Sequence, residues 1–204
     1  MRISKPELAI LAGIAVIILS VVLPAVWAVY LHRPERMARA DLRRLVDAGR
    51  RFNAEYGVWP ARDSAEGGDI RFGQDVPNWE LVNALRAVDG PGNVNHMTNP
   101  RRIVFLELKP YETARSGVDK NGEFLDPWGT PYQVVVDADA SGVCMIENTI
   151  HGTGVGLGFI AWSCGPDRRS DTPDDILSWT AKDNVKEIGE IPKPSGPPLA
   201  NPAY

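Results

Sequence analysis

An uninterrupted apolar stretch near the N-terminus constrains this chain more than any other feature. It reads ELAILAGIAVIILSVVLP over residues 7–24, and no charged residue occurs from Leu8 to Leu31. A helix of about 24 residues spans about 36 Å, which exceeds the roughly 30 Å thickness of a bilayer's hydrocarbon core. We therefore predict a transmembrane helix within residues 1–32, with Trp27 near its interfacial end.

Two residues of this stretch are unusual for a plain membrane anchor. Glu7 lies at the edge of the apolar run, where a carboxylate that enters the membrane needs a positive partner. Pro24 lacks a backbone N–H and so removes one hydrogen bond from the middle of the helix. Taken singly, Glu7 could simply flank the span at the depth of the lipid headgroups, and Pro24 could be an ordinary kink of a membrane helix.

Taken together, these residues form a specific pattern. Glu-Leu, an apolar run and Leu-Pro-Ala, with Glu7 and Pro24 seventeen residues apart, resemble the N-terminal helix of type IV pilins and type II secretion pseudopilins. The resemblance implies that Glu7 pairs with the N-terminal amine of a neighbouring subunit in a filament. It implies that Pro24 is the helix breaker. The resemblance implies that a prepilin peptidase cleaves between Arg2 and Ile3 and that the new amine of Ile3 is then methylated. Arg2 stands where the family has Gly, so the sequence leaves open whether cleavage occurs.

A second motif, DPWGTPY, occupies residues 126–132. Asp126, Pro127 and Gly129 suit the first, second and fourth positions of a type I turn, and a strand over residues 132–137 is predicted to follow. A hairpin turn with a packed Trp would show the same features. The motif also resembles the core motif of the major pseudopilins (protein G) of type II secretion systems, where it opens the β-sheet.

A third motif is an acidic loop that follows a predicted strand over residues 157–163. Four aspartates fall within nine residues: Asp167, Asp171, Asp174 and Asp175. So many carboxylates repel one another unless they are neutralised. Arg168 and Arg169 could neutralise them in part, and Ca²⁺, which takes six to eight oxygen ligands, would do so better.

The acidic loop resembles the C-terminal calcium loop of the major pseudopilins. The resemblance implies that Asp167 and Asp175 are side-chain ligands and that Cys164 gives its backbone carbonyl. Asp174 and Asp171 are weaker candidates. A solvated acidic loop without calcium is the alternative.

Three other features have plain interpretations. Residues 137–142 place oxygens as in half of an EF-hand loop, but Asn148 occupies the position where a bidentate Glu is needed, so we favour a turn between strands. The glycine-rich residues 151–158 lack the Lys of a phosphate loop and are interpreted as a flexible hairpin tip. Cys144 and Cys164 could form a disulfide outside the cytoplasm or remain two buried free thiols.

The remaining pattern predicts a small mixed domain. Residues 35–56 have an amphipathic helical period that ends at Gly57, and residues 58–78 are predicted to be loop. A short helix over 79–88, capped by Asn78, and a strand over 102–108 come next. A proline-rich tail, residues 181–204, is expected to be extended and poorly ordered.

The function classes are limited by composition and by missing motifs. The net charge of −4 gives no reason to expect nucleic-acid binding. The sequence contains no G-x-S-x-G, H-E-x-x-H, phosphate-loop or dinucleotide motif, so we expect a protein that is not an enzyme.

The positively charged residues give a conflicting topology signal. Five arginines follow the apolar helix, namely Arg33, Arg36, Arg39, Arg43 and Arg44, whereas Arg2 and Lys5 precede it. The positive-inside rule therefore favours a cytoplasmic domain. The pilin resemblance implies a single-pass inner-membrane protein with a periplasmic C-terminal domain, and we adopt it because acidic residues are interspersed among the arginines.

These observations predict an α+β, pilin-like fold with a long N-terminal helix packed on a small antiparallel β-sheet. The predicted segments are the membrane helix (1–32), its amphipathic continuation (33–57), a globular domain with a calcium loop (58–180) and the tail (181–204). The resemblance implies a pseudopilin that polymerises with itself, contacts other pseudopilins, inner-membrane secretion components and lipid, and serves protein export. The alternatives are a pilin of a type IV pilus and a membrane-anchored, extracytoplasmic calcium-binding domain that does not polymerise.

Overall fold

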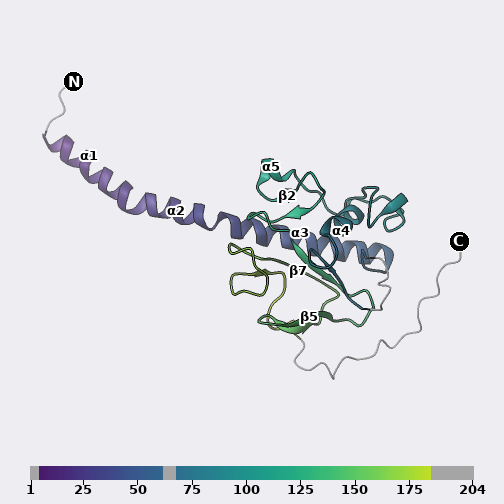
Figure 1. Ribbon diagram of the computed structural model, residues 1–204. Coiled ribbons are helices and arrows are strands. Elements are labelled where there is room, and N and C mark those ends of the chain that lie inside the picture. The colour runs from purple at the N-terminus through teal and green to yellow at the C-terminus, as the bar shows by residue number, and fades with distance from the viewer. Residues whose placement is uncertain (1–4, 62–67, 185–204) are drawn as a thin grey trace. The chain divides into compact units, whose positions relative to one another are not determined.

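The computed structural model describes residues 5–61 and 68–184 of the chain (Figure 1). The chain divides between Arg36 and Met37 into two compact units. Arg2 and Ile3, the predicted processing residues, and residues 185–204 of the predicted tail lie outside the described residues.

The N-terminal unit is helical. It contains α1 (Lys5–Ile17), a π-helix η1 (Ile18–Val22) and α2 (Leu23–Leu31). The window Ile10–Trp27 is long and apolar enough to cross a membrane, and none of it is buried inside the protein. The exposure distinguishes it from a core helix, although a signal sequence near the N-terminus would have the same length and composition.

The π-helix lies directly before Pro24. The N–H of Leu23 donates to the carbonyl of Ile18, five residues earlier, and the Ser20 hydroxyl donates to the carbonyl of Ile17 at 3.4 Å. A proline ring crowds the carbonyl four residues before it, and a wider π turn is one way in which a helix absorbs such crowding. The chain therefore stays helical through Pro24, and the expected break takes the form of one widened turn.

Helix α3 (Arg33–Tyr56) supplies the spine of the second unit. Its buried residues recur at helical spacing and include an unexpected aspartate: Ala38, Asp41, Leu42, Leu45, Val46, Ala48, Gly49 and Phe52. Gly57, at φ +73°, ends the helix by donating its N–H to the carbonyl of Asn53 at 2.8 Å. The predicted amphipathic helix and its stop are confirmed.

The central sheet has four antiparallel strands in the order β1-β4-β7-β8. The strands are β1 (Ile70–Phe72), β4 (Gln133–Val136), β7 (Phe159–Ser163) and β8 (Ile176–Leu177). Val135 of β4 pairs with Ile160 of β7. The strands predicted over residues 132–137 and 157–163 are therefore present as β4 and β7.

Alternation along the strands gives the sheet two buried faces. Val134, Val136, Phe159 and Ala161 share one core with α3. Val135, Ile160 and Trp162 face the other way and share a second core with the hairpin of β5 (Cys144–Thr149) and β6 (Gly152–Val155). Because side chains alternate with a period of two, one strand serves both layers. The sheet is thus enclosed between α3 and the β5–β6 hairpin.

Some predicted elements differ from the structure. Residues 102–108 form no strand, because the N–H groups of Phe105 and Leu106 both donate to the carbonyl of Leu85, at 2.9 and 3.1 Å, instead of to a neighbouring strand. The residues predicted as a flexible hairpin tip include strand β6. The predicted tail begins inside the fold, since Asn184 forms a bridge with Val155.

The short helix α4 (Asn78–Leu85) ends earlier than predicted, and Asn78 does not cap it. Pro77 precedes the helix, and the buried Asn78 amide donates to the carbonyls of Phe124 and Tyr132 at 2.9 and 3.0 Å. A side chain expected to act locally therefore ties α4 to the sheet region. The smaller elements are η2 (Val94–His96), α5 (Tyr111–Ala114), β2 (Gly117–Val118) and β3 (Phe124–Leu125).

Candidate functional site

The DPWG turn joins the central sheet to the acidic loop through Asp126. Gly129, at φ +85°, donates its N–H to the carbonyl of Asp126 at 3.0 Å, so the predicted turn is present. The Asp126 Oδ1 atom accepts the N–H groups of Trp128 and Thr130, at 3.0 and 2.9 Å. Its Oδ2 atom accepts the Ser163 hydroxyl at 2.6 Å. Ser163 is the last residue of β7, so this carboxylate fixes the turn against the start of the loop.

Asp126 is completely buried, and burial raises its pKa above the usual range, although the hydrogen bonds from Ser163, Thr130 and Trp128 oppose the shift. The sequence predicted the turn but not the contact with Ser163, because the two residues are 37 positions apart. The motif therefore positions the acidic loop as well as opening β4.

Each aspartate of the acidic loop accepts a hydrogen bond from the chain itself. Asp167 accepts the N–H of Arg169 at 2.8 Å, and Asp171 accepts the N–H of Ile150 at 2.7 Å. Asp174 accepts the Thr172 hydroxyl at 2.8 Å and the N–H of Asp167 at 3.1 Å. Most of these hydrogen bonds lie within the loop itself. The exception is the bond to Asp171 from Ile150, which belongs to the turn of the β5–β6 hairpin.

Asp175 has the most donors of the four aspartates. Its Oδ2 atom accepts the N–H groups of Asp171 and Thr172, at 2.8 and 3.2 Å. The Nε2 atom of His151 lies 2.8 Å from the same oxygen, and the side chains of His151 and Asp175 are 15% and 0% exposed. His151 lies in the turn of the β5–β6 hairpin and was not among the predicted site residues.

The predicted calcium ligands do not all converge in this arrangement. In the described part of the chain, the loop aspartates form no group of three acidic side chains whose ligand atoms lie within 4.8 Å of one another. Ca²⁺ needs six to eight oxygens, and here N–H and hydroxyl donors already face several of the loop's carboxylate oxygens. Calcium binding by Asp167, Asp175, Asp174, Asp171 and the Cys164 carbonyl stays a prediction.

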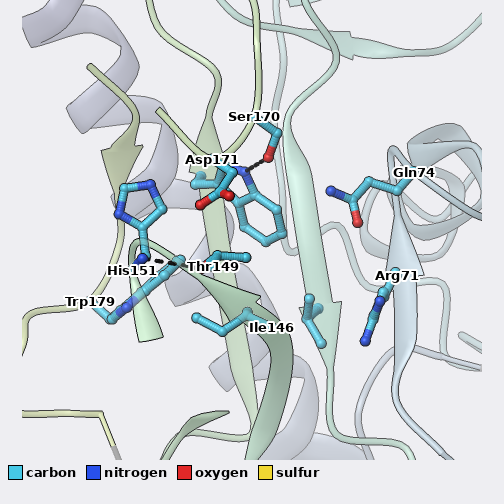
Figure 2. Close-up of a pocket in the computed structure, with 10 residues that line it drawn as sticks. Arg71, Gln74, Ile146, Thr149, His151, Ser170, Asp171 and Trp179 are labelled. Carbon is cyan, nitrogen blue, oxygen red and sulfur yellow. Dashed lines mark hydrogen bonds between the residues drawn. The ribbon is translucent and has the colours of Figure 1, made fainter. Parts of the chain in front are cut away.

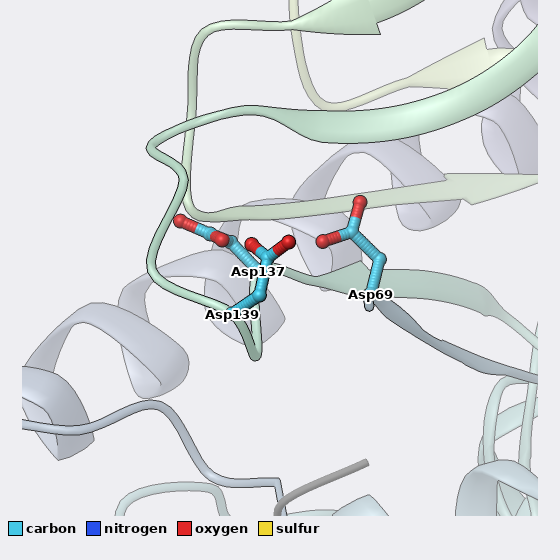
Figure 3. A group of neighbouring side chains, drawn as sticks. All are labelled: Asp69, Asp137 and Asp139. Atoms are coloured by element: carbon cyan, nitrogen blue, oxygen red, sulfur yellow. The ribbon is translucent and has the colours of Figure 1, made fainter. Parts of the chain in front are cut away.

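A different acidic cluster has the closer geometry. One ligand atom each of Asp69, Asp137 and Asp139 lies within 4.8 Å of the others. Figure 3 shows Asp69, which precedes β1, beside Asp137 and Asp139 in the turn after β4. Hard divalent cations favour such carboxylate groups, so these residues could hold one.

The cluster is anchored by backbone donors and is crowded with negative charge. The Asp137 carboxylate accepts the N–H groups of Ser141 and Gly142, at 2.9 and 2.8 Å, which confirms the turn predicted over residues 137–142. Asp69 Oδ2 accepts the N–H of Met145 at 2.5 Å, whereas its Oδ1 atom is buried without a partner among the described residues.

The pKa of Asp69 is raised to about 6, mainly by burial; the Met145 N–H opposes this rise, and the charges of Asp137 and Asp139 contribute to it. Burial likewise raises the pKa of Asp137. Protons or a cation would therefore relieve the cluster. No local pattern pointed to Asp69, which lies 68 positions before Asp137.

A pocket on the hairpin side of the sheet is too small for an ordinary substrate. Arg71, His151, Trp162, Asp171 and Trp179 are among the residues that line it (Figure 2). Its volume is about 40 Å³, against the roughly 300–1,000 Å³ of typical ligand pockets. One or two water molecules would fill this space.

The two cysteines are buried free thiols, which settles the alternatives left open by the sequence. Cys144 packs against Val135 and Ile160 in the hairpin core, whereas Cys164 lies at the start of the acidic loop. Burial raises the pKa of Cys164 to about 12, and the pKa of Cys144 is also raised by burial. Neither thiol is poised to act as a nucleophile.

Comparisons with protein-family models, with curated proteins and with solved structures found no match to this chain.

Proposed function

We propose that this chain is a structural pseudopilin subunit of a type II secretion system, similar to the major pseudopilins (protein G). In this proposal it polymerises with itself into a periplasmic pseudopilus that serves protein export. The observation that carries the proposal is the exposure of the apolar span: none of the window Ile10–Trp27 is buried inside the protein. Such a surface needs lipid or other helices to cover it.

Glu7 supplies the specificity in this proposal. Helices in lipid gain no hydrophobic free energy by associating, so packing and polar contacts decide how they align. A carboxylate at the edge of the span that pairs with a neighbour's N-terminal amine would favour one axial offset over all others. Glu7 would therefore set the register of the filament.

The globular unit supports a role as a structural subunit. Its α3 spine is buried on a small antiparallel sheet, in agreement with the α+β class, and the DPWG turn fixes the start of the acidic loop. The 40 Å³ pocket offers no room for a metabolite, and both thiols are buried, which supports a non-enzymatic role. The filament proposal does not depend on whether the acidic loop takes up calcium.

The proposed location is the inner membrane, crossed once, with the C-terminal unit in the periplasm. The proposed partners are other copies of the chain, other pseudopilins, inner-membrane components of the secretion machine and membrane lipid. Nucleic acid is not a proposed partner.

Cysteine cross-linking in native membranes tests the assembly step. Val16 is 63% exposed within the apolar span, and a Val16→Cys substitution would place a reactive thiol there, while Cys144 and Cys164 stay buried. We expect oxidation to give a covalent dimer, because each chain has one reactive thiol and a disulfide joins two. Combining Val16→Cys with Glu7→Ala should reduce the dimer at least about tenfold, since the loss of a charge pair worth about 1.4 kcal/mol gives that factor.

The matched control is Glu35→Ala. Glu35 is another carboxylate of the N-terminal unit, but it lies beyond the apolar span, where it contacts His32 at 3.7 Å. We expect the covalent dimer to persist in that variant. An undiminished dimer with Glu7→Ala would contradict the assembly role of Glu7, and monomers alone with Val16→Cys would favour the anchored domain that does not polymerise.

A further inference from the structure

We infer that the turn of the β5–β6 hairpin holds the acidic loop closed through His151 and Ile150, so that the loop needs no metal ion. Two contacts reach the loop from this turn. His151 Nε2 lies 2.8 Å from Asp175 Oδ2, and the Ile150 N–H donates to Asp171 Oδ1 at 2.7 Å. This inference concerns the fold of the loop alone and stands apart from the proposed filament.

The chemistry of the His151–Asp175 pair determines which side chain donates the hydrogen bond. An ionised carboxylate only accepts hydrogen bonds, so the Nε2 atom that faces Asp175 carries the proton. The same Oδ2 atom also accepts the N–H groups of Asp171 and Thr172. Three hydrogens therefore point at the oxygen that a cation would approach. Imidazole nitrogen is also a ligand that suits transition metals better than Ca²⁺.

Burial makes this contact stronger than an ordinary surface pair. The side chain of Asp175 is fully buried and that of His151 is 15% exposed, so water screens the interaction poorly. Removing His151 would leave a buried carboxylate with fewer donors, which is a costly change.

The hairpin turn is itself anchored from its other side. The Asn184 amide donates to the carbonyl of His151 at 2.8 Å, and Asn184 forms a bridge with Val155 of β6. The turn thus connects the acidic loop to residues 180–184. A contact made from an anchored turn loses less side-chain and backbone entropy than one between two free loops.

The arginines of the loop do not replace this contact. Arg168 and Arg169 are exposed, and their side chains form no ion pair with the loop aspartates in the described ranges of the chain. The sequence had left open that they could neutralise the loop in part. The donors that close the loop are instead backbone N–H groups, the Thr172 hydroxyl and His151.

The test is thermal melting of the full chain in detergent, with calcium chloride or with EDTA. A calcium site filled to about 100 times its Kd would raise the melting temperature by about 5–10 °C. The measurement uses an Asp69→Asn background, so that the separate cluster of Asp69, Asp137 and Asp139 has lost a ligand. We expect this protein to shift by less than about 2 °C between the two conditions. His151→Ala should lower the melting temperature by about 4–8 °C in both, and His151→Gln, which keeps an N–H donor, should recover part of the loss.

His96→Ala is the control, because His96 lies in η2 and, among the described residues, its side chain is in hydrogen-bond contact with Asn93 alone, at 3.5 Å. Amide hydrogen exchange separates a local effect from a general one: His151→Ala should speed exchange over residues 167–175 while α3 stays protected. A chelator-induced drop of 5 °C or more in the Asp69→Asn background would overturn the inference. Unchanged melting and exchange in His151→Ala would overturn it equally.

Discussion

Buried carboxylates connect distant parts of this chain. Asp41, on the buried face of α3, accepts the hydroxyls of Ser116 at 2.6 Å and Tyr132 at 3.4 Å, residues 75 and 91 positions away. Asp126 connects the DPWG turn to Ser163 in the same manner. A carboxylate bonded by neutral hydroxyls fixes the geometry between elements, because each donor has one suitable position.

Asp69 gives a pH-dependent prediction. Its pKa rises from 3.8 to about 6, mainly through burial, so the folded protein binds more protons than the unfolded chain between about pH 4 and pH 6. The contribution of Asp69 to the free energy of unfolding therefore falls as the pH rises through that window. In EDTA, Asp69→Asn should raise the melting temperature at pH 7 and leave it unchanged at pH 4.

The matched control is Asp75→Asn, because Asp75 is exposed nearby in sequence and should change melting little at either pH. Repeating the measurement in calcium asks whether the cluster of Asp69, Asp137 and Asp139 holds a cation. A variant that loses stability only in calcium would indicate ion binding there. A loss of stability at pH 7 in EDTA would contradict the pH argument.

The packing of α3 on β7 depends on a small residue. A side chain at Gly49 would place its Cβ 2.8 Å from ring atoms of Phe159, which is only 2% exposed. We predict that Gly49→Val lowers the free energy of unfolding by about 1–3 kcal/mol, since overpacking forces the ring or the helix to move. Urea unfolding of the full chain in detergent would measure it.

Ala54→Val is the control for Gly49→Val, because Ala54 is an exposed residue of the same helix. It introduces the same β-branched side chain without a buried neighbour, and should cost about 0.7 kcal/mol or less. Because Gly is a poorer helix former than Val, propensity alone would leave Gly49→Val neutral or slightly stabilising. A Gly49→Val variant that is as stable as the parent would therefore contradict the proposed clash with Phe159.

Elements with a strong period were predictable from the sequence, and elements defined by distant partners were not. The apolar stripe of α3 and the β-branched run of β4 each indicate which of their residues are buried. Residues 102–108 have the composition of a strand, but a strand needs a ladder partner, and the carbonyl of Leu85 takes two of its N–H groups. Composition alone contains no information about that partner.

In the candidate site, too, the features with a local sequence pattern were predictable and those set by distant partners were not. The sequence located the acidic loop and the turn at residues 137–142, because carboxylates cluster there along the chain. It missed His151 and Asp69, which reach these clusters only through the β5–β6 hairpin and the segment before β1. Pairs separated by 24 or more residues follow from topology, which a local pattern does not specify.

The N-terminal apolar helix is long enough to cross a membrane and leaves its surface exposed, and the second unit has two filled cores. In the proposed function this helix anchors the chain, and Glu7 makes it an assembly element if a neighbour's amine lies at the right depth. Ile3 lies four positions before Glu7 in the sequence, so cleavage before Ile3 would make Glu7 the fifth residue of the mature chain. The position of the mature N-terminus therefore decides between a filament subunit and a simple anchored domain.

The most direct test is the intact mass and N-terminal sequence of the protein purified from its native membrane. The account predicts a mature chain that begins at Ile3 and has one added methyl group on its amine. A mature chain that retains Met1 and Arg2 would leave no amine in position to pair with Glu7, and would contradict the proposed filament subunit.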